Sequence, residues 1–280
     1  MYVLEIPCFD LKTIYLSKQS PRWIRVNDNK YIVLHKNKAV KVEQQKQRVI
    51  FDCPEDEVLS FWWDYFDLSL DYNDLYYRIK NLGELEIKIV ANRSKGIHIL
   101  KQDIFEVMAS ILVDKNTIQI IAEKAGVKHG ESMREMGIVK WYEFPTPERL
   151  LKKKACLNGI ISENDKLFSL AELIAEGWLD LSFFETSSKK DAFEYLYSFE
   201  IFTKRDISKI GLYALHYMDQ FPKDNDLSYA LKKFGMDYSD FYDWFISDNK
   251  QIKANAGLMR QYLIYSQSNE PTRIEHWMKQ

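Results

Sequence analysis

The chain has 280 residues, of which 46% are hydrophobic and 29% charged, so it can bury a sizeable core and is not wholly disordered. A run of about 18 apolar residues, as a membrane span would need, does not occur. The first residues lack a basic region and include Glu5, so we expect no signal peptide and a cytoplasmic location. The net charge of −2 excludes a strongly basic domain and leaves room only for a small basic patch.

The cysteine, histidine and glycine content gives no sign of a metal or an organic cofactor. Cys8, Cys53 and Cys156 are odd in number and widely spaced, which excludes a disulfide framework and a cysteine zinc site. The five histidines lie apart from one another, and no glycine-rich phosphate loop occurs. We therefore expect no metal site and no bound cofactor.

The first fifty residues predict an antiparallel sheet. Short runs of β-branched and aromatic residues occur at 2–6, 22–26, 30–35, 38–43 and 47–52. The asparagine-rich stretches beginning at Asn27 and Lys36 favour tight turns between them. Because only one short helix, at 11–16, fits between these runs, hairpin connections are expected.

From Pro54 onward the apolar residues recur at helical spacing. The proline and the acids that follow it indicate a helix start. Further helices are predicted at 71–81, 102–113, 116–125, 130–137, 146–153, 163–176, 188–198, 203–218, 225–234, 238–247 and 251–267. The predicted fold is α+β, an N-terminal antiparallel β-sheet followed by an all-helical bundle. We divide it into 1–95, the sheet with its following helices, and 96–280, the helical domain.

One segment near residue 210 combines a helix with an acidic residue after a turn. Thr203 is a suitable N-cap for an amphipathic helix from Lys204 to Met218. Phe221-Pro222 then turns the chain, and Asp224 opens the next helix. A carboxylate at a helix N-terminus is favoured in its ionised form. On spacing alone, a simple capping role is the plainer interpretation.

An ordered set of motifs resembles the 8-oxoguanine DNA glycosylases of the helix-hairpin-helix superfamily. The set spans nearly the whole chain, in the order of that family. Its members are Phe9-Asp-Leu, Arg22-Trp, Trp63-Asp-Tyr-Phe-Asp-Leu, Gly96-Ile-His-Ile-Leu-Lys-Gln-Asp, Phe144-Pro-Thr-Pro, Phe221-Pro-Lys-Asp and Ala256-Gly-Leu-Met-Arg-Gln-Tyr-Leu.

The resemblance implies base excision on double-stranded DNA, by a protein that we expect to be a monomer without a membrane partner. Such enzymes flip a damaged base into a pocket and cut its N-glycosidic bond. A lysine on the second helix of the hairpin attacks the sugar, and an aspartate nineteen residues later stabilises the cationic sugar. Asp224 matches that aspartate, which adds a catalytic role to its capping role.

The position of the family's lysine is altered. Nineteen residues before Asp224 stands Arg205, which stays protonated and cannot act as an amine nucleophile. Lys204 is one residue early and points about 100° away around the helix. Lys209 lies one turn beyond Arg205, on roughly the same face, and could reach the same pocket. Phosphate contact by Lys204 and Arg205, with Lys209 in solvent, is an equally good interpretation.

The DNA-contacting segments are altered too. Ile201-Phe-Thr replaces the family's Gly-x-Gly turn, which leaves the side chains of Thr203 and Lys204 to bind phosphate. Lys115 replaces the asparagine expected to fill the gap in the duplex, with Asn116 beside it. Glu163 replaces an arginine that would face DNA.

The base pocket also differs from the family pattern. Arg260 and Ile264 stand where the resemblance places a glutamine and a phenylalanine. Two hypotheses follow. The chain is an N-glycosylase that works without the usual lysine, with Asp224 stabilising the sugar cation and Arg260 and Lys209 reading or protonating an unusual base. Alternatively, it is an inactive relative that binds DNA or a protein through the old surface, as its near-neutral charge and Glu163 suggest.

Overall fold

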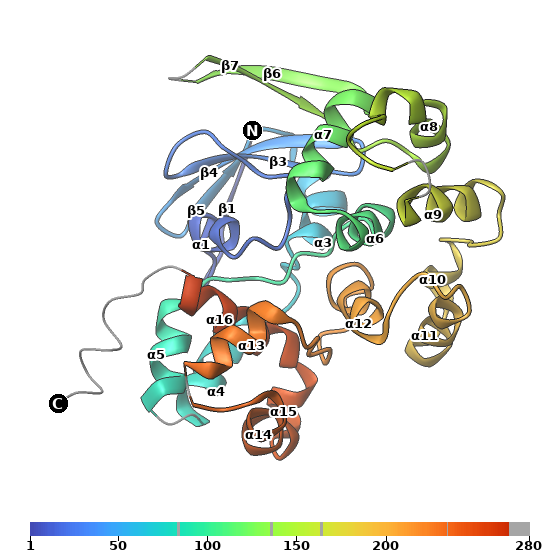
Figure 1. Cartoon of the computed structure of the whole chain (residues 1–280). Helices are drawn as coiled ribbons and strands as arrows, with labels where there is room; N and C mark the ends of the chain where they lie inside the picture. Colours follow the sequence, from blue (N-terminus) through green and yellow to red (C-terminus); the bar gives the residue numbers. More distant parts are fainter. Residues whose placement is uncertain (83–84, 135–136, 163–164, 234, 269–280) are drawn as a thin grey trace.

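The computed structural model describes residues 1–82, 85–134, 137–162, 165–233 and 235–268. Within these residues a strand-rich part lies at one end of the molecule, and helices make up most of the remainder (Figure 1). The predicted α+β class, with an N-terminal antiparallel sheet followed by helices, is confirmed. No helix in this described part of the chain is both long enough and apolar enough to cross a membrane.

The N-terminal sheet is antiparallel throughout, in the order β1-β5-β4-β3-β2. Its strands are β1 (Tyr2–Glu5), β2 (Ile24–Arg25), β3 (Lys30–His35), β4 (Lys38–Gln45) and β5 (Arg48–Phe51). The register pairs Val33 with Val40 and Tyr31 with Val42, so these apolar side chains share one face. That face packs on α1 (Leu11–Leu16) and on the segment formed by α2 (Glu55–Glu57), η1 (Val58–Trp62) and α3 (Trp63–Tyr65).

The expected helix at 130–137 is wrong, and so is the expectation that the second part of the chain is all-helical. Strands β6 (Lys128–Arg134) and β7 (Gly137–Tyr142) form an antiparallel hairpin there. A Cβ on Gly130 would lie 2.6 Å from the ring of Trp141, so the two strands can approach only with glycine here. Trp141 packs on Ile32 and Leu34 of β3. This contact between distant segments outweighs the local helical spacing.

The C-terminal helices share a core with the two helices that follow α3 in the chain. Helices α4 (Tyr72–Leu82) and α5 (Leu85–Arg93) pack with α13 (Asn225–Lys232), α14 (Tyr238–Phe241), η3 (Tyr242–Ser247), α15 (Lys250–Ala254) and α16 (Ala256–Ser268). Helix α5 was not predicted. This core contains residues on both sides of position 95, and the division at that position stays a prediction.

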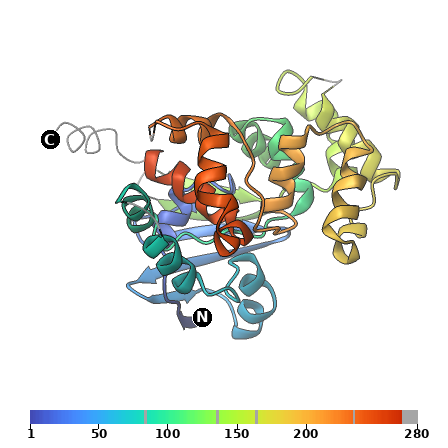
Figure 2. The ribbon, with the colours of Figure 1, turned by 90° about the horizontal axis from the view of Figure 1, so that it is seen from below.

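A second helical core is formed by the middle of the chain. It contains residues of α6 (Ile104–Leu112), α7 (Lys115–Ala125), α8 (Pro147–Lys152), η2 (Lys154–Leu157), α9 (Lys166–Ala175), α10 (Phe183–Thr186), α11 (Lys189–Tyr197) and α12 (Lys204–Tyr213). Helix α12 belongs to both cores, because Ile207 and Ile210 pack in this one and Leu212 packs in the other. Figure 2 shows α12 between the two groups of helices.

Candidate active site

Helix α12 is the second helix of a helical hairpin that begins with α11, and its ends are set by local hydrogen bonds. Thr203 and Asp206 form a capping box, in which the Thr203 hydroxyl accepts the N–H of Asp206 and the carboxylate accepts the N–H of Thr203. The helix ends at Tyr213 rather than at the predicted Met218. His216 takes a φ of +59°, and the N–H of Tyr217 donates to the Gly211 carbonyl at 2.8 Å, which closes the helix end.

Asp224 is the N-cap of α13, as the sequence predicts. Its Oδ1 accepts the N–H of Leu227 at 3.0 Å, and the side chain is only 7% exposed. The preceding Phe221 is buried in the C-terminal core, and its carbonyl accepts the hydroxyl of Tyr238. The turn before Asp224 is therefore anchored, and the carboxylate is held in one place.

The side chain of Arg260 forms an ion pair with Asp224 and is 3% exposed. Its Nη2 donates to Oδ2 of Asp224, its Nε donates to the Pro222 carbonyl at 2.9 Å, and its Nη1 donates to the Tyr213 hydroxyl at 2.7 Å. The guanidinium thus connects α16 to the end of α12 and to the start of α13. It is fixed by three partners, whereas the sequence analysis expected it to read the base.

Lys209 is also brought to Asp224. Its Nζ lies 2.8 Å from Oδ2 of Asp224, the oxygen that also accepts from Arg260. The Lys209 side chain is 27% exposed. The expectation that Lys209 reaches the same place as Asp224 is met by this geometry, while its chemical role stays a prediction.

The partners of Asp224 determine its charge. Burial raises the pKa of this carboxyl group, but the Arg260 guanidinium, the Lys209 ammonium and the Leu227 N–H lower it more, so the pKa lies below its usual value. Asp224 is therefore ionised at neutral pH and carries its charge on the wall of a cavity.

That cavity has a volume of about 410 Å³, which is in the usual range for small-molecule sites. Its lining comes from α6, α7, α12, α13, α16 and the segment that follows α1. The charged lining residues are five cations, Lys18, Lys115, Arg205, Lys209 and Arg260, and three acids, Asp206, Asp224 and Asp226. The site is thus locally positive in a chain whose net charge is −2.

Arg205, Thr203 and Lys204 lie at the start of α12. Arg205 lines the cavity, but its side chain is 52% exposed, and its one ion pair within the described part of the chain is with the adjacent Asp206, at 3.8 Å. Thr203 and Lys204 are exposed and do not line the cavity. The predicted DNA contacts of Thr203 and Lys204 thus fall at an exposed helix N-terminus, where anions are favoured.

Three other predicted residues divide between the cavity and the surface. Ile264 lines the cavity. Lys115 also lines it, and its Nζ donates to the Lys18 carbonyl at 2.5 Å, so the side chain bridges α7 and the segment after α1. Although Lys115 is exposed as a residue, desolvation of its ammonium lowers its pKa. Asn116 is exposed and does not belong to the cavity.

The sequence analysis missed several residues of this site. The hydroxyl of Tyr213 is hydrogen-bonded to both Arg260 and Gln261. Tyr213 lies four residues after Lys209, which lies four residues after Arg205, so all three share one face of α12, and this spacing could have identified Tyr213. Gln102 and Gln267 line the cavity from distant parts of the chain. The side-chain nitrogens of these two residues are buried without a hydrogen-bond partner in the described structure, so two donors face no protein acceptor.

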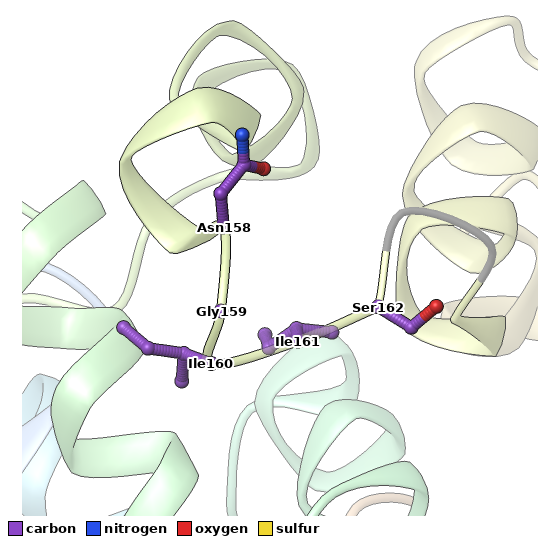
Figure 3. A pocket seen from close by; sticks show the side chains of 5 residues that line it. All are labelled: Asn158, Gly159, Ile160, Ile161 and Ser162. Carbon is purple, nitrogen blue, oxygen red and sulfur yellow. The ribbon is translucent and has the colours of Figure 1, made fainter.

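A second cavity of about 450 Å³ lies elsewhere, along the single stretch from Asn158 to Ser162 (Figure 3). Its lining residues in the described part of the chain carry no titratable side chain that could serve as a general acid or base. The adjoining Glu163, expected to face DNA, lies outside the described residues.

The N-terminal part of the chain matches a known family model. Residues 2–108 match the model described as the N-terminal domain of 8-oxoguanine DNA glycosylase. None of the curated protein sequences compared with the chain matches it.

Solved structures share the fold over almost the whole chain. The 8-oxoguanine glycosylase/lyase of Clostridium acetobutylicum, in complex with double-stranded DNA containing cytosine opposite 8-oxoguanine, is 25% identical, with a TM-score of 0.75 and coverage of 92% of this chain and 91% of that one. MBOgg1 with a low-affinity DNA ligand has a TM-score of 0.79 at 22% identity, covering 94% of each chain. The 3-methyladenine DNA glycosylase of Archaeoglobus fulgidus has a TM-score of 0.66 at 18% identity, covering 94% and 97%.

The family model ends before Asp224, so the catalytic role of this buried aspartate after the helical hairpin stays a prediction. Arg205 stands nineteen residues before Asp224, where the resemblance expects a lysine; this correspondence, and that of Arg260 and Ile264 to the base pocket, stay predictions. Residues 2–108 resemble the N-terminal domain of 8-oxoguanine DNA glycosylase, and the chain as a whole shares the fold of 8-oxoguanine glycosylases of known structure.

Proposed function

We propose that this protein is a DNA glycosylase of base-excision repair. It binds double-stranded DNA, takes a damaged or modified base out of the stack into the cavity beside Asp224, and cuts the N-glycosidic bond. The observation that carries this proposal is the Asp224 carboxylate, which is ionised, 7% exposed and fixed on the cavity wall.

The charge of Asp224 suits the reaction. When the base departs with the bonding electron pair, positive charge develops on the sugar. A carboxylate that is already oriented stabilises this charge without having to reorganise, and it does so more strongly in a site shielded from water. The α13 N-cap and Arg260 keep Asp224 oriented, and the exposed start of α12 lies nearby for phosphate contact.

The mechanism proceeds without the lysine in its usual place. Arg205 holds that place on α12, and a guanidinium is not an amine nucleophile. Water can instead attack the cationic sugar once the base has left, which leaves an intact abasic strand. The base expected from the resemblance is 8-oxoguanine. Because Arg260 and Ile264 line the pocket in place of the residues that the resemblance expects, the assay below compares several bases.

A second function is favoured by one specific observation. Both oxygens of Asp224 already have protein partners, namely the Leu227 N–H on one side and Arg260 and Lys209 on the other. An aspartate so fully engaged could serve only to join α12, α13 and α16. The protein would then be an inactive relative that binds DNA or a protein partner.

A panel of labelled duplexes tests the proposal. Each duplex carries one modified base, chosen from 8-oxoguanine, alkylated purines, uracil and modified cytosines, and is incubated with protein and then treated with or without alkali. Strand cleavage of at least one duplex after alkali is the expected result, because alkali breaks any abasic strand that excision leaves intact. Absence of excision on every duplex that the protein demonstrably binds would favour the inactive relative.

Asp224→Asn is the decisive variant for this assay. Asparagine still caps a helix, so folding should be retained while the negative charge is lost. We expect excision to be abolished and DNA affinity to be kept. Asp237→Asn is the matched control, because Asp237 caps α14 in the same way and is exposed outside the cavity. An unchanged rate with Asp224→Asn would contradict the proposed role.

A further inference from the structure

We propose that Lys209 has taken over as the amine that bonds covalently to the sugar, and that Arg260 makes this possible by holding Asp224 when Lys209 leaves it. This inference rests on the proposed function and adds a lyase step to it. It assigns Lys209 as a catalytic residue and Arg260 as a positioning residue.

The two cations on Asp224 differ in how firmly they are held. Arg260 is 3% exposed and has two further acceptors, the Pro222 carbonyl and the Tyr213 hydroxyl. Lys209 is 27% exposed, lines the cavity, and has Asp224 as its one ion-pair partner among the described residues. When a sugar enters the cavity, Lys209 is therefore the cation that can move.

Arg260 removes the main cost of that movement. A buried carboxylate that loses its only cation is strongly destabilised, because neither water nor charge compensates for its burial. Here Asp224 keeps the Arg260 guanidinium and the Leu227 N–H after Lys209 has left. Arg260 and Lys209 thus share one aspartate, with Arg260 placed to stay and Lys209 free to leave.

The helix geometry places Lys209 suitably. Four residues along an α-helix bring a side chain back to almost the same face, about 6 Å further along the axis. Arg205 and Lys209 both line the cavity, whereas Lys204 does not. Of the three lysines that line it, Lys18, Lys115 and Lys209, the last is the one whose ammonium contacts Asp224 in the described structure. Lys115 is the rival amine, since its pKa is lowered, but it donates to the Lys18 carbonyl.

The step can be written on an abasic site, which avoids any assumption about the base. Nζ of Lys209 gives one ammonium proton to water and adds its lone pair to the C1′ aldehyde carbon, while the C=O π electrons move to oxygen. That oxygen takes one proton from nitrogen and one from a hydronium ion and leaves as water, while nitrogen and C1′ form an iminium. Water then takes a proton from C2′, the electron pair left behind forms a bond to C3′, and the 3′ phosphate leaves with the electrons of the C3′–O bond. If borohydride is present, it donates hydride to C1′ and converts the iminium to a stable secondary amine.

The experiment uses the full-length protein, a duplex with one abasic site, and sodium cyanoborohydride. We expect a covalent protein–DNA adduct whose peptide map places the modification on Lys209. Lys209→Ala should lower adduct formation by about tenfold or more, while Lys190→Ala, an 81%-exposed lysine on α11, should leave it unchanged. Mapping of the wild-type adduct makes the assignment independent of whether a variant folds.

Arg260→Gln provides the readout for the positioning role. Without the guanidinium, Asp224 keeps Lys209 as its remaining cation, so trapping should fall, and Arg260→Lys, which returns a positive charge beside Asp224, should restore most of it. An equal loss with Arg260→Gln and Arg260→Lys would overturn this part.

The outcomes separate the two proposals. An adduct mapped to Lys115 or Lys18, or no adduct at all, would overturn the assignment of Lys209. If the lesion panel still gives alkali-dependent excision, the glycosylase proposal stands without the lyase step. If no base is excised from any bound duplex, the proposed function fails as well.

Discussion

The ion pair between Arg260 and Asp224 should be the contact on which the stability of the site most depends. The two side chains are 3% and 7% exposed, so neither charge is well hydrated. Removal of one partner from a buried pair costs roughly 3–5 kcal/mol in free energy of unfolding. Because Lys209 still contacts Asp224, we expect Arg260→Met to cost about 3 kcal/mol, near the lower end of that range.

A double-mutant cycle isolates the pair from the other contacts of Arg260. Arg260→Met, Asp224→Asn and the double variant are unfolded in urea at pH 7, with tryptophan fluorescence as the signal. The double variant should be more stable than the two single losses together predict, by a coupling energy of about 1–3 kcal/mol. Arg78→Met is the control, because its pair with Asp74 is exposed and should contribute less than about 1 kcal/mol. Additivity to within about 0.5 kcal/mol would refute the reasoning.

The pH dependence of this pair has a definite direction. The folded-state pKa of Asp224 is lowered, so the stability it adds is fully present above the unfolded-state pKa of about 3.9. That stability is lost as the pH falls through the folded-state value. The stability difference between wild type and Asp224→Asn should therefore be constant from pH 7 to about pH 5 and should shrink below about pH 4. A difference that grows on acidification would contradict the assignment.

Two further predictions concern DNA binding and the fold. Lys204→Ala should weaken DNA binding and reduce the slope of log affinity against log salt by about one, as measured by fluorescence anisotropy; an unchanged slope would show that Lys204 does not meet a phosphate. Gly96→Ala should cost about 1–3 kcal/mol in thermal or urea unfolding, because Gly96 has a φ of +92° and a Cβ there would lie 2.7 Å from Cβ of Asp10. Gly177→Ala should cost less, since its φ is also positive but nothing lies within 4 Å, and an equal cost would discount the contact with Asp10.

Local patterns were sufficient for most of the secondary structure. The strand 30–35 and the helix 11–16 are found at their predicted bounds, because alternation and helical spacing are properties of neighbouring residues. The capping role of Asp224 was predictable for the same reason. The predictions that were wrong concern segments whose structure depends on more than the spacing of neighbouring residues. The β6–β7 hairpin depends on Trp141 lying over Gly130 and packing on β3, and the end of α12 depends on the left-handed conformation of His216.

The sequence by itself determined the family motifs, the sheet-then-helices layout and the presence of an acid after the hairpin. It also placed Arg205 nineteen residues before Asp224, where the resemblance expects a lysine. Only the tertiary structure decided what Arg260 does, because its partners Pro222, Tyr213 and Asp224 lie 36 to 47 residues away along the chain. It likewise brought Lys209 to the same carboxylate oxygen. The energy of an ion pair depends on the distance between the two charges in space. The spacing of side chains along one helix therefore cannot specify which charged residue of another helix lies next to them.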